Sequence, residues 1–253
     1  MSKKLVVLGA GWLGNALSQE AKLAGWQVEA TRRTADSQAQ ICAFDLTDSG
    51  LHHTLTLTDA YWVCAIPPRM RQANSNYLET LKHALATAQS MACKGFILCS
   101  STAVYDTADG VYTEQGTLAE QDSKRQQVLQ GAEELVKGTG GKIVRLAGLV
   151  GPEREPGRFI SGKQLSSSSQ AKVNMLHQQD AVNGLICLIE NWSHAQGIYN
   201  LCHPDHPTKQ DYYQKHCENY GSTPPTFNSD TQSERIIEGS AICQLGFKYN
   251  HEI

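Results

Sequence analysis

Three glycines near the start of the chain are spaced for contact with phosphate groups. The apolar run Leu5–Leu8 has the composition of a buried parallel strand, and the spacing G-x-G-x-x-G follows it directly. The first glycine permits a tight turn, the second lets a pyrophosphate approach the backbone, and the third lets the new helix pack on the strand. Because the helix N-terminus adds free N–H groups and partial positive charge, the motif predicts a dinucleotide site, with a purely structural turn as the alternative. The residues expected to contact the cofactor are Gly9, Gly11, Trp12, Leu13 and Gly14.

Two arginines at the end of the second expected strand indicate which dinucleotide binds. An acidic residue there would accept the ribose 2′-hydroxyl hydrogen bonds of NAD. Glu29 lies roughly 20 residues after Gly9, near the usual distance, but it falls in the middle of the strand Gln27–Thr31. Arg32 and Arg33 follow that strand, and guanidinium groups bind a 2′-phosphate through charge-assisted hydrogen bonds. The sequence therefore favours NADP over NAD, with two arginines on a solvated turn as the alternative.

Residues that follow the third and fourth strands are further candidates for cofactor contact. Asp45 is placed to accept a hydrogen bond from the adenine amino group and Leu46 to pack on the ring, or else Asp45 caps a short helix. Ala65, Ile66 and Pro67 end the fourth strand with small or donor-free residues, which allows close passage beside the cofactor. Turn chemistry alone is the alternative explanation for the proline.

The alternation of apolar strands and amphipathic helices predicts the scaffold that positions these side chains. Strands are expected at Leu5–Leu8, Gln27–Thr31, Ile41–Phe44, Ala60–Ala65, Gly95–Cys99 and Lys142–Leu146. Helices are expected at Trp12–Ala24, Ala73–Ala92 and Leu118–Lys137. With right-handed crossovers, this alternation gives an α/β fold with a Rossmann-type, doubly wound parallel sheet.

The character of the chain changes after Gly151-Pro152, where polar residues and shorter elements begin. We expect residues 1–155 to form the NAD(P)-binding domain and 156–253 to form a smaller C-terminal α/β substrate lobe, partly interleaved with the first. Ser166–Ser169 is typical of a mobile loop. The elements expected in the lobe are a strand near Val173–Leu176, a helix Gln179–Asn191, a strand Gly197–Cys202 and a helix Lys209–Asn219.

Composition excludes several other classes of protein. The 22 Lys and Arg and 25 Asp and Glu residues give a net charge of −3 without long runs of one sign, which argues against nucleic acid or a membrane surface as partner. We expect neither a signal peptide nor a membrane span, because no apolar run approaches the roughly 18 residues that a span needs. Its 8 scattered cysteines are typical of a reducing compartment, so we expect a cytoplasmic protein. His52-His53 and His203–His206 lack a credible third ligand nearby, so no metal is expected.

Three longer segments carry a resemblance to a known family. They are Phe96–Tyr105, which contains S-S-x-x-V-Y, Arg145–Pro152, and Asn174–Val182, which contains H-x-x-D. Together with the glycine motif, they are similar in type and order to the extended short-chain dehydrogenases/reductases, the NAD(P)-dependent epimerase/dehydratase family. The resemblance implies that Ser101 is the catalytic serine, which hydrogen bonds the substrate oxygen. It also implies that Leu146 and Leu149 line the nicotinamide, whereas Arg145 is expected to be structural.

The family's catalytic pair, Y-x-x-x-K, is missing from this chain. In the family the tyrosine acts as acid and base and the lysine lowers its pKa, but none of the 9 tyrosines here has a lysine four residues later. Matching Gly131–Leu135 to the stretch just after the lysine puts Arg125 at the tyrosine position and Leu129 at the lysine position. Arginine cannot act as a base near neutral pH, although it can bind an anion or polarise a carbonyl. Candidate replacements, each with a structural role as the alternative, are Tyr105, Tyr112, His177 and Asp180.

Two classes of function follow from these observations. The first is an NADP-dependent oxidoreductase or epimerase with non-standard catalytic residues, acting on a nucleotide-sugar-like or other small polar substrate. Its substrate would contact Tyr105, Arg125 and His177. The second is a catalytically inactive protein that senses or sequesters NADP(H), which the missing pair favours. By analogy with the family, a homodimer through the helices at Ala73–Ala92 and Leu118–Lys137 is expected.

Overall fold

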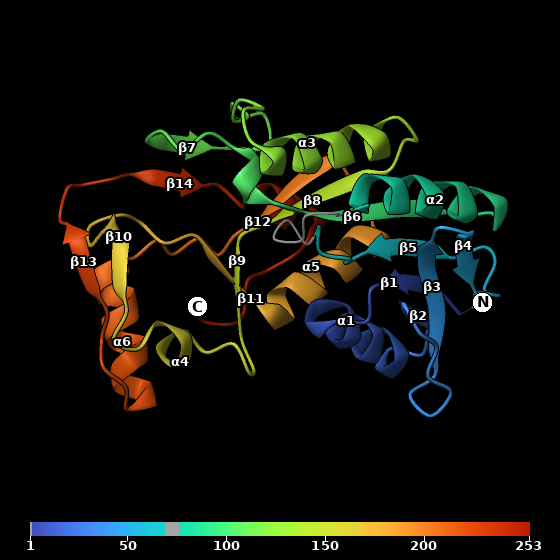
Figure 1. Ribbon diagram of the computed structural model, residues 1–253, viewed down its shortest axis with the longest axis horizontal. Coiled ribbons are helices and arrows are strands. Elements are labelled where there is room, and N and C mark those ends of the chain that lie inside the picture. The colour runs from blue at the N-terminus through green and yellow to red at the C-terminus, as the bar shows by residue number, and fades with distance from the viewer. Residues whose placement is uncertain (1, 69–75) are drawn as a thin grey trace.

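The centre of the molecule is an eight-stranded sheet with the order β12-β8-β6-β5-β1-β2-β3-β4. A computed structural model describes residues 2–68 and 76–253 of the chain (Figure 1). The strands are β1 (Lys4–Leu8), β2 (Gln27–Arg32), β3 (Ile41–Thr47), β4 (Gly50–His53), β5 (Tyr61–Cys64), β6 (Gly95–Ser101), β8 (Lys142–Leu146) and β12 (Ile198–Leu201). All neighbouring strands are parallel except β3 and β4, which form an antiparallel hairpin. The sequence-predicted Rossmann-type α/β fold is confirmed, and its strand order reverses between β1 and β5, where open α/β sheets bind ligands.

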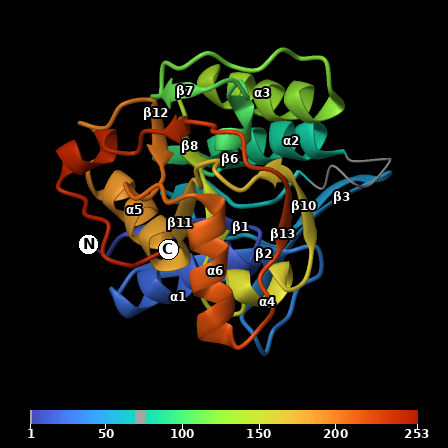
Figure 2. The ribbon, with the colours of Figure 1, turned by 90° about the vertical axis from the view of Figure 1, so that its left-hand side faces the viewer.

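Helices cover both faces of this sheet, which explains its apolar strands. In Figures 1 and 2, α2 (Tyr77–Ser90) and α3 (Lys124–Lys137) lie on one face, and α1 (Trp12–Leu23) and α5 (Gln178–Glu190) lie on the other. Leu5 to Leu8 of β1 are fully buried between the two layers. The predicted helix over 73–92 is present from Tyr77 to Ser90, while its positions 73–75 lie outside the described residues.

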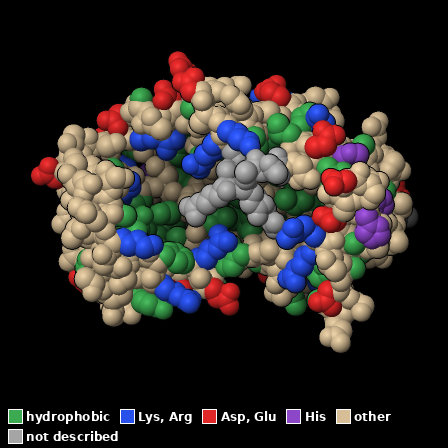
Figure 3. All heavy atoms as spheres, in the orientation of Figure 1, with side chains coloured by type: hydrophobic (Ala, Val, Ile, Leu, Met, Phe, Trp, Pro, Cys, Tyr) green, Lys and Arg blue, Asp and Glu red, His purple; other side chains and the backbone are tan. Residues whose placement is uncertain are grey.

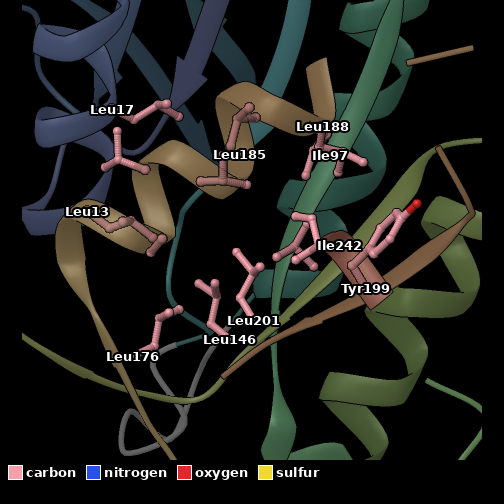
Figure 4. Close-up of a cluster of buried hydrophobic side chains, with 14 of the residues drawn as sticks. Leu13, Leu17, Ile97, Leu146, Leu176, Leu185, Leu188, Tyr199, Leu201 and Ile242 are labelled. Carbon is pink, nitrogen blue, oxygen red and sulfur yellow. The ribbon is translucent and has the colours of Figure 1, made fainter. Parts of the chain in front are cut away.

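The larger hydrophobic core lies between the sheet and the layer of α1 and α5. Figure 4 shows Leu13 and Leu17 of α1 close to Leu185 of α5, with Leu146 and Leu201 of the strands below them. These side chains come from both ends of the sequence. The C-terminal half of the chain therefore completes the core that the N-terminal half begins.

Smaller elements form the rest of the molecule. The short helix α4 (Pro156–Ile160) packs on α6 (Lys209–Tyr220), beside a pair of parallel strands, β10 (Gln164–Ser168) and β13 (Thr226–Ser229). Two further parallel pairs are β9 (Gly148–Val150) with β11 (Met175–His177), and β7 (Gly110–Tyr112) with β14 (Arg235–Ile237). Two 3-10 turns, η1 (Thr102–Val104) and η2 (Ala241–Leu245), complete the described elements. Among the described helices, none has the length and apolar character needed to cross a membrane.

The structure corrects two expectations for the C-terminal part. The strand predicted at Gly197–Cys202 is β12, which pairs with β8 in the main sheet, and α5 packs on α1 rather than in the lobe. The segment Ser166–Ser169, predicted as a mobile loop, lies largely in β10, and Ser169 is buried. Both differences arise from pairing between distant segments. Local composition does not contain that information.

Candidate functional site

The glycine turn after β1 adopts the backbone path that its spacing predicts. Gly9 has φ +93°, and a Cβ there would lie 3.0 Å from the backbone nitrogen of Ile66. A Cβ at Gly14 would overlap the carbonyl oxygen of Gly9, so α1 reaches this close to the turn only with glycine. At Gly11 the result is the opposite, because no atom lies within 4 Å of the Cβ position. Two glycines thus allow close packing, and the middle one leaves open space above the turn.

This open space has the properties of a phosphate cradle. The carbonyl of Gly11 accepts the first helical hydrogen bond, from Asn15 N at 2.8 Å. The N–H groups of the residues between them belong to the first turn of a 12-residue helix, where backbone donors lack intrahelical acceptors. No acidic side chain stands in that first turn. The residues present therefore fit a pyrophosphate at the positive end of α1.

The end of β2 lies directly beside the glycine turn. The hydroxyl of Thr31 accepts a hydrogen bond from Gly9 N at 3.1 Å, and Arg32 Nε donates to the carbonyl of Ala10 at 3.1 Å. The exposed guanidinium of Arg32 is thus held over the turn, and Arg33 is also exposed. These positions match the place where the sequence puts the adenosine ribose.

Glu29 has a structural role that removes it from this ribose position. Its carboxylate accepts hydrogen bonds from Thr56 N at 3.0 Å, Thr56 Oγ1 at 2.6 Å and Leu57 N at 3.0 Å. The acidic side chain therefore fixes the segment before β5. This contact agrees with the sequence argument that Glu29 lies too early in the strand to bind the cofactor.

Asp45 and Leu46 lie within β3, which continues to Thr47 before turning back into β4. Asp45 stands opposite His52 in the hairpin. No helix follows Asp45, so the alternative role of a helix cap is wrong. Both side chains are half-buried beyond the level of Arg32, and contact with an adenine stays a prediction.

Trp12 connects the glycine turn to the segment after β9. Its indole Nε1 donates to the carbonyl of Pro152 at 2.8 Å, and the guanidinium of Arg154 lies 4.3 Å from the ring centroid. Gln178 Nε2 donates to the carbonyl of Trp12 at 2.8 Å. Trp12 thus has a packing role that joins the turn to the residues leading into α4 and α5.

A cavity of about 540 Å³ opens beside the ends of β5 and β6. Its lining residues are Pro68, Tyr77, Leu98, Cys99, Ser100, Ser101, Arg125, Leu129 and Ala132. The tertiary structure therefore brings Ser101 together with Arg125 and Leu129, the two residues at the positions of the missing pair. Ser101 is half-buried, and its hydroxyl oxygen accepts from Ala103 N at 3.2 Å. Arg125 is exposed and contributes a positive charge to the cavity.

Tyr105 lies in the core, away from this cavity, which corrects its expected contact with substrate. It is only 1% exposed, and its hydroxyl donates to Asn200 Oδ1 at 2.7 Å. Arg145 Nη1 donates to the same hydroxyl at 2.8 Å, and the Arg145 guanidinium pairs with Glu133 at 2.7 Å. The structural role predicted for Arg145 is confirmed. Its charge is fully buried and compensated by that carboxylate.

The other candidate replacements also have local partners instead of facing the cavity. His177 caps α5 by accepting from Gln179 N at 3.1 Å, and its ring stacks on His251 at 4.8 Å. Asp180 is fully buried and accepts from the backbone N–H and ring Nδ1 of His251. Tyr112 donates to the carbonyl of Ala108 at 2.9 Å. None of these residues is among the described lining residues of the cavity.

The two leucines expected beside the nicotinamide occupy different environments. Leu146 is 7% exposed and belongs to the large core. Leu149 is half-buried in β9, where it pairs with Leu176 of β11. Neither residue lines the cavity as described. Contact between these leucines and a nicotinamide stays a prediction.

Tyr77 is a cavity residue that the sequence did not mark as functional. It begins α2 and is one of the buried residues of that helix. Its side chain lines the cavity together with Arg125 and Leu129 of α3. No local signal separates a core tyrosine from one that faces a cavity, because that difference depends on how α2 and α3 pack.

The sheet order and the glycine turn at its centre define a Rossmann-type fold with a doubly wound parallel sheet. Solved structures with this fold include the UDP-N-acetylglucosamine 4-epimerase of Bacillus cereus, with TM-score 0.79, 17% identity and coverage of 99% of this chain and 92% of that one. MoeE5 in complex with UDP-glucuronic acid and NAD gives TM-score 0.80 and 17% identity over 98% of this chain and 94% of that one. The chain therefore shares its fold with solved structures of epimerases, in line with the resemblance seen in the sequence.

Comparison of sequences identifies a nearer relative. No family model matches the chain. Protein YeeZ of Escherichia coli strain K12 is 32% identical over 267 aligned positions, which cover 98% of this chain and 96% of that protein. The same values hold for Protein YeeZ of Escherichia coli O157:H7. The chain belongs to the family of Protein YeeZ.

Proposed function

We propose that this protein is an NADP-dependent oxidoreductase or epimerase that acts on a small, polar, anionic substrate with non-standard catalytic residues. The observation that carries the proposal is that residues at the end of one strand contact both the glycine turn, where the cofactor would bind, and the cavity, where the substrate would bind. Ile66, just after β5, packs against Gly9 of the glycine turn, and Pro68, two residues later, lines the cavity with Ser101 and Arg125. A dinucleotide on the turn therefore has its reactive end directed along β5 toward that cavity.

Each half of the site has a chemical role in this proposal. The bound dinucleotide supplies the hydride donor or acceptor. The N-terminus of α1 and the open space at Gly11 hold the pyrophosphate. Ser101 hydrogen bonds the substrate oxygen, and Arg125 binds an anionic group or polarises a carbonyl. Leu129 makes no polar contact with a ribose, so the ribose is held by other groups.

NADP is favoured over NAD by the residues around the adenosine end. Arg32 is anchored over the turn through its Nε, which leaves the terminal nitrogens of its guanidinium for a 2′-phosphate. Glu29, the acidic residue at the usual sequence distance, is bound to Thr56 and Leu57. MoeE5, which shares the fold, is in complex with NAD, so the proposed preference for NADP rests on the residues of the present chain and not on the fold.

The charge of the site supports an anionic substrate. Figure 3 shows Lys and Arg side chains gathered around the hollow in the middle of one face, with hydrophobic side chains inside it. The whole chain carries a net charge of −3, so this gathering is local. A basic rim attracts anions and raises their local concentration. A nucleotide sugar is one substrate of this kind, and MoeE5 is in complex with UDP-glucose in a related structure.

Cofactor preference is tested by fluorescence titration of NADPH and NADH. We expect the parent protein to bind NADPH more tightly, and Arg32→Asp to weaken NADPH binding by at least about tenfold, or about 1.4 kcal/mol, while NADH binding changes little. Lys22→Asp is the matched control, because it makes the same charge change at the far end of α1. Equal affinities of the parent for both cofactors would refute the preference for NADP.

A second experiment separates an enzyme from a binding protein. Oxidation of NADPH is followed with a panel of carbonyl compounds and nucleotide sugars, for the parent and for Ser101→Ala. An enzyme shows turnover that Ser101→Ala lowers. The alternative, a protein that senses or sequesters NADP(H), is favoured by Arg125 and Leu129 at the positions of the missing pair. The binding protein is the better explanation if NADPH binds, no compound of the panel is turned over and Ser101→Ala leaves NADPH binding unchanged.

A further inference from the structure

The cavity beside Ser101 contains a phenol from a different helix than the one on which the family carries its tyrosine. Tyr77 begins α2, across the cavity from Leu129 of α3. The residue is 7% exposed, and its hydroxyl forms no hydrogen bond with any residue of 2–68 or 76–253. A buried tyrosine normally pairs its hydroxyl. The hydroxyl of Tyr77 is not among the described buried atoms that lack a partner, which agrees with a hydroxyl that is accessible from the cavity its side chain lines.

The other lining residues are poor proton donors. Arg125 holds its proton at any physiological pH. Ser100 donates its hydroxyl proton to Glu133 at 2.7 Å. Ser101 has a hydroxyl that can orient a substrate oxygen, but an alcohol is a much weaker acid than a phenol. Among the described lining residues, Tyr77 supplies the phenol.

We propose that Tyr77 is the catalytic acid of this site and takes over, from α2, the role of the tyrosine that is absent from α3. The inference rests on the proposed function, because it requires hydride transfer in the cavity. When a carbonyl substrate is reduced, its carbon receives the hydride and becomes reduced, and the nicotinamide is oxidised. The electron pair released from the C=O bond takes the proton of the Tyr77 hydroxyl, and the phenolate regains a proton from water.

The environment of Tyr77 agrees with a proton donor. Burial, with smaller contributions from Cys64 and Cys99, raises its pKa well above the ordinary value. The phenol is therefore protonated at neutral pH, and the same burial makes it a weaker acid than a solvent-exposed tyrosine. Ser101 and Arg125 stand in the same cavity and would hold the substrate oxygen while the proton moves.

The test uses Tyr77→Phe with Tyr212→Phe as the matched control. Tyr212 is also buried, at 3% exposure, and its hydroxyl likewise has no partner in the described structure, but it lies in the core of the small lobe. Both variants lose the same hydroxyl group, so a general effect on folding appears in both. With a carbonyl compound that the parent reduces, we expect Tyr77→Phe to lower kcat by about 10²- to 10⁴-fold with little change in NADPH affinity. Tyr212→Phe keeps the parent kcat.

A second readout does not depend on turnover. The ring carbon next to the hydroxyl of each tyrosine is labelled with ¹³C, and the signal lost in Tyr77→Phe identifies Tyr77. The chemical shift of the Tyr77 signal should differ between the complexes with NADP⁺ and NADPH, because the oxidised nicotinamide carries a positive charge that acts on a nearby phenol. The Tyr212 signal should be the same in both complexes.

The outcomes separate the inference from the proposal on which it rests. Turnover with an unchanged kcat in Tyr77→Phe overturns the role of Tyr77 and leaves the enzyme intact. An identical Tyr77 signal in both complexes overturns it as well, since the phenol is then far from the reacting ring. Absence of NADP(H) binding refutes the proposed function, and the inference falls with it.

Discussion

The three glycines of the turn are not equivalent, and alanine substitutions at two of them should have opposite effects. At Gly14, a methyl group would overlap the carbonyl oxygen of Gly9 and lie 3.0 Å from Val7 Cγ1. The oxygen belongs to the backbone and cannot rotate away, so α1 must shift from β1. At Gly11 the methyl group meets no atom within 4 Å, and the φ of −85° suits alanine. One variant should therefore damage mainly the fold, and the other should damage mainly the site.

The magnitudes follow from these contacts. Overpacking at Gly14 costs about 1–3 kcal/mol, and the better helix propensity of alanine offsets about 1 kcal/mol of it. We expect Gly14→Ala to lose up to about 2 kcal/mol of unfolding free energy, or about 4–8 °C in Tm for a chain of this size. Gly11→Ala should lose about 1 kcal/mol or less, because alanine ranks well below glycine at a helix N-cap but meets no atom here. Its methyl group stands where the pyrophosphate is expected, so NADPH affinity should fall by at least about tenfold, or about 1.4 kcal/mol.

Thermal unfolding and NADPH titration on both variants check this pair of expectations. If Gly11→Ala keeps the parent affinity for NADPH, the glycine turn is not the pyrophosphate site. If Gly14→Ala unfolds at the parent temperature, the close approach of α1 to the turn does not constrain the residue at 14. Either result would refute the reasoning from the Cβ positions.

Two further predictions concern stability. Glu133→Gln leaves the buried Arg145 without its counter-charge and should lower the unfolding free energy, measured in urea, by about 3–5 kcal/mol. Glu134→Gln at the surface is the control and should change the unfolding free energy by less than about 1 kcal/mol. Equal effects of the two substitutions would contradict the burial argument. Burial is the main cause that lowers the pKa values of His177 and His216. On acidification, these two histidines therefore bind protons in the unfolded chain before they do so in the folded protein. Stability should therefore be complete above about pH 6.5 and fall on acidification toward the lowered pKa values, by at most about 1.4 kcal/mol per pH unit for each histidine. A double variant in which both become glutamine should show a flatter profile between about pH 7.5 and 5.5, and an unchanged slope would exclude these two residues.

The sequence by itself determined the features that depend on local pattern. An apolar run followed by three glycines at fixed spacing allows one backbone path, because only glycine tolerates the positive φ at Gly9 and the contact at Gly14. Alternating apolar strands and amphipathic helices then required a covered parallel sheet. The absence of a lysine four residues after any tyrosine was equally readable. Arg125 and Leu129, at the positions of the missing pair, line the same cavity as Ser101.

Only the tertiary structure decided which side chains share that cavity. Tyr77 and Tyr105 look alike in the sequence, yet packing of α2 on α3 brings Tyr77 to the cavity, while β6, β8 and β12 enclose Tyr105 with Arg145. The place of β12 in the main sheet also depends on pairing with β8, more than 50 residues earlier. The physical reason is the same in each case. Local patterns fix which face of an element is apolar, but contacts between distant elements decide whether that face meets the core or an open space.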